Sequence, residues 1–81
     1  MTTLELREYI YARILRSGAA GLTDEELSQS LDVAGDVARH RRHELVQFGL
    51  IVNSGIRRPT RRGHTASVWM SGNVAKKTGR I

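Results

Sequence analysis

Apolar side chains recur every three or four positions over the first sixteen residues, which is the spacing of side chains on one face of an α-helix. They form two rows: Leu6, Ile10 and Ile14 in one, and Leu4, Tyr11 and Leu15 in the other. Thr2 and Glu5 stand three residues apart before them, as in a capping box, where each side chain bonds the other residue's backbone N–H. The pattern predicts a helix over residues 3–16.

The two apolar rows of this first helix together span about 180°, whereas a helix that covers only its own core needs a stripe of roughly 100°. Something else is therefore expected to cover the second row. The strands of a later hairpin are one candidate. A second copy of the chain is the other, so a homodimer through the first helix is a hypothesis at this point.

A turn that contains glycines follows, and a second helix is predicted over residues 24–31. Leu22 is expected to form a single inward strand position before it. Thr23 and Glu26 make a second capping box. The acidic run over residues 24–26 lies where the helix dipole favours negative charge, so we interpret it as capping and not as catalytic carboxylates.

A third helix is predicted over residues 36–48, after a short turn. Ala38, Leu45 and Phe48 have the spacing of its inner face. The opposite face is basic and hydrogen-bonding: it carries Asp36, Arg39, His40, His43 and Gln47, with Arg41 and Arg42 between the two faces. Two helices joined by so short a turn form the unit with which many proteins read DNA.

A hairpin is predicted next, with strands over residues 50–53 and 65–71. Trp69 alternates with Val68 and Met70, which places it on the other face of the strand, and we assign it to core or dimer packing in preference to base stacking. Residues 56–64 are expected to form a bent or mobile tip without ladder hydrogen bonds. This tip contains five basic side chains or histidines: Arg57, Arg58, Arg61, Arg62 and His64.

The last ten residues, 72–81, show little periodicity and contain Lys76, Lys77 and Arg80. We predict a flexible basic tail here. At 81 residues, the rest of the chain is long enough for one domain, residues 1–71.

Charge is divided unevenly along the chain, whose formal net charge is +5. Residues 1–34 carry three basic and six acidic side chains, and residues 35–81 carry ten basic and two acidic ones. A polyanion would therefore meet the second half of the molecule. The alternative is a solvated basic surface that serves solubility.

Several classes of function are disfavoured by the composition. The chain has no Cys, which excludes a disulfide, a thiolate zinc site and a cysteine nucleophile. His40 and His43 lack a third metal ligand at a persuasive spacing, and the serines lack a His and acid arrangement. No signal peptide or long apolar run is visible. We expect a cytoplasmic protein that is not an enzyme and holds no cofactor.

The run LSQSLDVAGDVARHRRHELVQFGLI, residues 27–51, followed by a basic hairpin that ends in ASVW, resembles the winged helix-turn-helix family of DNA-binding proteins. The stretch RRPTRRGHTASVW, residues 57–69, is similar to the wing of small members that bacteriophages and their actinobacterial hosts encode. The resemblance implies an α+β fold with three helices followed by a two- or three-stranded antiparallel wing. It also implies that the third helix enters the major groove and the wing touches the neighbouring backbone or minor groove.

The functional expectation is a sequence-specific double-stranded DNA-binding protein, a transcriptional regulator of phage or bacterial origin. Arg39, His40 and His43 are expected to reach bases. Arg41 and Arg42 are expected mainly to hold phosphates, and the alternative is that they reach Glu44 and neighbouring acids. Gln47 belongs to the DNA-binding helix but lies too near its C-terminal end to reach a base. The wing is expected to contact phosphates or a narrow minor groove through Arg57, Arg58, Arg61, Arg62 and His64. If about six cations neutralise phosphates, log K falls with log salt at a slope of about −5. An architectural factor in phage replication or excision and a protein-interaction module are the alternatives.

Overall fold

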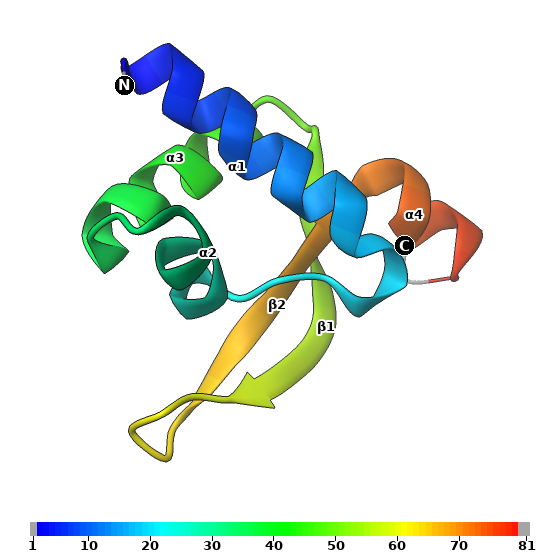
Figure 1. Ribbon diagram of the computed structural model, residues 1–81. Coiled ribbons are helices and arrows are strands. Elements are labelled where there is room, and N and C mark those ends of the chain that lie inside the picture. Colours follow the sequence, from blue (N-terminus) through cyan, green and yellow to red (C-terminus); the bar gives the residue numbers. More distant parts are fainter. Residues whose placement is uncertain (1, 80–81) are drawn as a thin grey trace.

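The computed structural model describes residues 2–79. These form a small α+β structure with the elements α1 (Thr3–Ser17), a 3₁₀ turn η1 (Gly18–Ala20), α2 (Asp24–Leu31), α3 (Gly35–Gln47), β1 (Ile51–Pro59), β2 (Thr65–Ser71) and α4 (Gly72–Lys77). Figure 1 shows α1 across the top of the molecule and the β1–β2 hairpin extending away from the helices. The arrangement is compatible with a winged helix-turn-helix.

Both predicted capping boxes are present and fix where α1 and α2 begin. The Thr2 hydroxyl accepts from the Glu5 backbone N–H at 3.1 Å, and the Thr23 hydroxyl accepts from the Glu26 backbone N–H at 3.2 Å. In return, the Glu26 carboxylate accepts from the Thr23 N–H at 2.8 Å. Each satisfied N–H belongs to the helix end, where no intrahelical partner exists. The predicted spans of the first two helices are confirmed.

The core lies where the three longer helices meet the start of β1. Its buried apolar members are Leu6, Ile10, Ile14, Leu27, Ala38, Leu45 and Ile51. The first apolar row of α1 is thus fully used, and burying each such aliphatic side chain contributes about 1.5–3 kcal/mol. The second row is different, because Leu4 and Leu15 are exposed and Tyr11 is only partly buried.

Phe48 corrects one expectation about α3. It was predicted on the inner face at the end of that helix, but the helix ends at Gln47 and the Phe48 side chain is 60% exposed. Its backbone N–H already caps the helix by bonding the Glu44 carbonyl at 3.0 Å. The chain turns at Gly49, where φ is +77°, so the phenyl ring falls outside the core.

The hairpin is longer than expected. Strand β1 runs to Pro59, and Arg57 and Arg58 pair with Ser67 and Ala66 of β2. The register of the pairing shifts between Asn53, where the predicted strand ends, and Arg57. Beyond this irregularity, the two strands pair again. The expectation that residues 56–64 lack ladder pairing is therefore wrong for Arg57, Arg58 and Pro59. Strand β2, residues 65–71, is confirmed.

Leu22 joins the hairpin to the helices as a third, single-residue strand position, as predicted. It bridges Trp69, with backbone N–H to O distances of 2.9 and 2.8 Å in the two directions. Gly21 permits this approach: its φ is +67°, and a Cβ there would lie 2.5 Å from a Val68 methyl and 2.7 Å from the Trp69 carbonyl oxygen. Only glycine fits both conditions.

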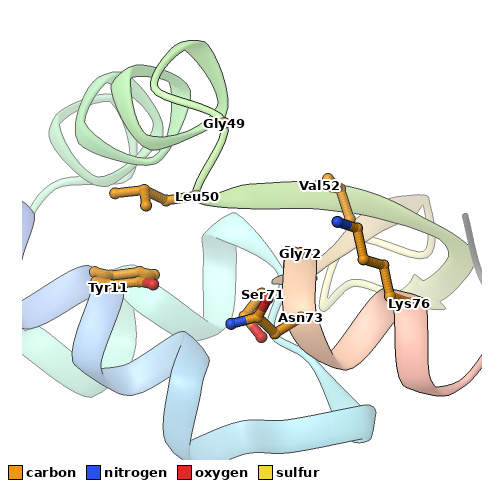
Figure 2. Close-up of a pocket in the computed structure, with 8 residues that line it drawn as sticks. All are labelled: Tyr11, Gly49, Leu50, Val52, Ser71, Gly72, Asn73 and Lys76. Carbon is orange, nitrogen blue, oxygen red and sulfur yellow. The ribbon is translucent and has the colours of Figure 1, made fainter.

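The segment after β2 also differs from the expected flexible tail. Residues 72–77 form α4, because the Ser71 hydroxyl accepts from the Val74 N–H at 3.2 Å and Ala75 is buried. Figure 2 shows Asn73 and Lys76 of α4 beside the start of β1, around a small hollow that Tyr11 and Leu50 also line. Arg80, the last cation of that tail, lies outside the described residues.

Within residues 2–79, no helix is long and apolar enough to cross a bilayer.

Candidate nucleic-acid interface

The outer face of α3 presents the side chains that the sequence predicted. Arg39, His40, His43 and Gln47 are all exposed. Within residues 2–79, no side-chain hydrogen bond or ion pair engages Arg39, His40 or His43. These groups can therefore bind an external partner without first breaking an internal contact.

The hairpin tip is the second exposed basic region. Arg61, Arg62 and His64 are exposed, and a compact turn carries them: the Thr60 N–H bonds the His64 carbonyl at 2.7 Å, and the Gly63 N–H bonds the Thr60 carbonyl at 3.1 Å. The Arg61 backbone N–H also lies 3.4 Å from a carboxylate oxygen of Glu25. This contact draws the tip towards the start of α2 and leaves the two guanidinium groups outside.

An open groove lies between the tip, the start of α2 and the start of α3. It is lined by Asp24, Glu25, Ser28, Gly35, Asp36, Arg39, Thr60, Arg62 and His64. Arg39 of α3 thus lies in the same groove as Arg62 and His64 of the tip. The groove also contains three carboxylates, and sequence reasoning missed this because it read the acidic run only as helix capping.

Arg42 has a different role from the expected phosphate contact. Its side chain is buried and forms a bidentate ion pair with Asp24, with Nε to Oδ1 at 2.8 Å and Nη2 to Oδ2 at 2.7 Å. The guanidinium carbon lies 3.9 Å from the centroid of the Trp69 ring, as in a cation–π contact. Arg42 therefore ties α3 to α2 and to the hairpin, and it is not available to DNA.

Arg58 is likewise engaged within the protein. One of its terminal nitrogens pairs with the Glu26 carboxylate, and the other donates to the Ala20 carbonyl at 2.6 Å. Burial alone would raise the pKa of the Glu26 carboxyl. The hydrogen bonds from Arg58 and from the Thr23 backbone, together with the Arg58 charge, outweigh burial and hold this pKa below its ordinary value. Arg58 anchors the base of the hairpin.

Two further arginines are partly committed. The Arg41 Nε lies 2.9 Å from Oε1 of Glu44, which is also 3.6 Å from the Arg7 guanidinium. Arg57 is exposed but lies along the hairpin, where it donates to the Thr65 hydroxyl and to the Thr65 carbonyl, both at 2.9 Å. The predicted basic set thus divides into outward groups and groups held by neighbours.

The structure gives no indication of a metal centre in the part of the chain that it describes, because no three His, Asp or Glu side chains of residues 2–79 gather as metal ligands would.

A comparison with protein-family models finds no match for this chain, and neither does a comparison with curated proteins.

Proposed function

We propose that the chain is a winged helix-turn-helix protein that binds double-stranded DNA sequence-specifically, with α3 in the major groove and the hairpin as the wing. One observation carries this proposal: the outward cations of α3 and of the hairpin tip, Arg39 and Arg62, line the same groove. The biological role proposed with it is transcriptional regulation in the cytoplasm of a bacterial or phage-infected cell.

The dimensions of α3 suit a major groove. A helix of 13 residues is about 20 Å long, and the groove is about 12 Å wide. A guanidinium group binds the O6 and N7 acceptors of guanine in a bidentate manner, and imidazole N–H groups donate to similar acceptors. Arg39 and His40 are suited to that chemistry, and His43 lies one turn further along the same face.

The carboxylates in the groove restrict how DNA can lie there. Asp24 is neutralised by Arg42, but Glu25 and Asp36 have no ion-pair partner within residues 2–79. These charges repel phosphates, so the floor of the groove favours base edges over the DNA backbone. A carboxylate accepts a hydrogen bond from the amino group of cytosine, which makes Asp36 a candidate reader at the start of α3.

The salt dependence of binding tests the proposal. With Arg42 and Arg58 held inside the protein and Arg41 partly held by Glu44, about three to four cations remain for phosphates, so the slope of log K against log salt is expected to be about −3 and not −5. The measurement is fluorescence anisotropy with a labelled duplex of mixed sequence at increasing salt. An affinity that does not change with salt contradicts this mechanism.

The hairpin tip can be tested in the same experiment. The double change Arg61→Ala and Arg62→Ala should weaken binding to all sequences alike and make the slope shallower by about 2. Arg13→Ala is the matched control, because Arg13 is an exposed arginine of α1 that does not line the groove. If wild-type protein does not retain duplex at all, a protein-interaction role replaces the DNA proposal.

The position of the binding sites on DNA distinguishes two biological roles. A footprint over a promoter supports a regulator, whereas phased sites at an origin or attachment site support an architectural factor. Binding in the groove does not depend on a homodimer through α1, because α1 does not line the groove.

A further inference from the structure

The second apolar row of α1 is largely uncovered. The exposed fractions are 55% for Leu4 and 45% for Leu15, and beside Leu4 two residues from the end of α3 and the start of β1 are also exposed, Phe48 at 60% and Leu50 at 40%. Leu4, Tyr11, Phe48 and Leu50 line one apolar groove. Figure 2 shows the Leu50 side chain facing the Tyr11 ring from the start of β1, so the patch continues from α1 onto the neighbouring segment.

Charge along α1 is arranged in two halves. Glu5 and Glu8 are exposed in its first half, where Arg7 is only partly exposed and lies 3.6 Å from Glu44, and Arg13 and Arg16 are exposed in its last half. A helix with such a distribution is complementary to a copy of itself that runs in the opposite direction. The same patch then serves on both molecules, which is the definition of an isologous two-fold interface.

We propose that α1 pairs antiparallel with α1 of a second copy of this chain. Leu4 of one copy then lies opposite Leu15 of the other. The same register brings Glu5 beside Arg16 of the other copy, because these two positions lie on one flank of the apolar row at 100° per residue. Phe48 and Leu50 extend the contact at each end.

Charge also argues against a membrane as the occupant. An interfacial helix that binds anionic lipids has a basic polar face. Here the groove is lined by Glu8 and by Arg7, whose guanidinium lies 3.6 Å from the Glu44 carboxylate, and Glu5 flanks the row at the end where the apolar residues are most exposed. A second copy, by contrast, supplies Arg16 at that end.

The first test measures the mass of the full chain by sedimentation velocity over the micromolar range, without DNA. Wild type should show a monomer–dimer equilibrium. Leu4→Glu and Leu15→Glu should each weaken dimerisation at least about tenfold, which corresponds to about 1.4 kcal/mol. The reason is that each change removes an apolar contact at both ends of the two-fold symmetric dimer. Val37→Glu is the matched control, since Val37 is 39% exposed on α3, outside the patch, and should leave the mass distribution unchanged.

The second test concerns direction and register. Glu5→Arg alone places two arginines together at each end of the dimer, and Arg16→Glu alone places two glutamates together, so each variant should be mainly monomeric. An equimolar mixture restores opposite charges at both ends and should dimerise. Far-UV circular dichroism of each variant checks that α1 remains helical after the change at its capping box.

A wild-type chain that stays monomeric throughout the range overturns the proposal, as does a dimer that Leu4→Glu and Leu15→Glu leave intact. Dimers that fail to recover in the mixture overturn the antiparallel register. Both tests are made without DNA. A chain that does not dimerise therefore leaves the DNA-binding proposal unaffected, and a chain that does not bind DNA leaves the dimer proposal unaffected.

Discussion

Arginines of this protein occur in two opposite environments only a helix width apart. Arg42 and Arg58 face inward and bind Asp24 and Glu26 of α2. Arg39, on the same helix as Arg42, faces outward and binds no side chain among residues 2–79. The difference shows that charge counted along a sequence is not the charge that a surface offers, because internal carboxylates neutralise part of it.

The largest effect should come from the inward group. Arg42→Ala leaves the Asp24 carboxylate partly buried without its cation and removes the group that covers the Trp69 ring. We expect the free energy of unfolding to fall by about 2–3 kcal/mol. Urea denaturation measures it. Arg39→Ala should change stability by less than about 0.5 kcal/mol, and equal losses for the two variants would erase the distinction.

The outward group should give the complementary result in binding. Arg39→Ala is expected to lower affinity for a sequence selected from a random duplex library by about 1–2 kcal/mol and to relax preference at one base pair. Affinity for unselected duplex should fall much less. Anisotropy titrations with both duplexes measure this. A uniform loss across both would show that Arg39 holds the backbone and does not read bases.

The smallest effect concerns pH. The pKa of Glu26 is lower in the folded protein than its ordinary value of 4.5, so the ionised carboxylate stabilises the fold above that pH. The contribution is lost as pH falls through the lowered pKa. Because about a third of each partner's side chain is exposed, its size is well below 1 kcal/mol. Unfolding free energies of wild type and Glu26→Gln should therefore converge below pH 4.5; a constant difference would contradict the assignment.

Much of the fold could be predicted from local signals. Thr2 and Glu5, like Thr23 and Glu26, lie three residues apart and specify helix starts without reference to the rest of the chain. The strand position at Leu22 was also accessible, because Leu22 is an apolar residue between the turn glycines and the capping box at Thr23.

The features that sequence reasoning missed depend on contacts between distant residues. Arg42 pairs with Asp24 over 18 positions and Arg58 with Glu26 over 32, and neither spacing has a local signature. One signal was present: a capping box needs a single acidic side chain, whereas residues 24–26 supply three. The helix over residues 72–77 was missed because its one buried side chain, Ala75, gives no periodicity.

The stacking of Arg42 on Trp69 gives the molecule an optical reporter of its own. Trp69 is the only tryptophan of the chain, and it lies in a half-buried place where α3, Leu22 and the hairpin come together. Its fluorescence spectrum therefore records whether the hairpin and α3 are still joined. No dye or label is needed to follow that junction during unfolding or on addition of a duplex.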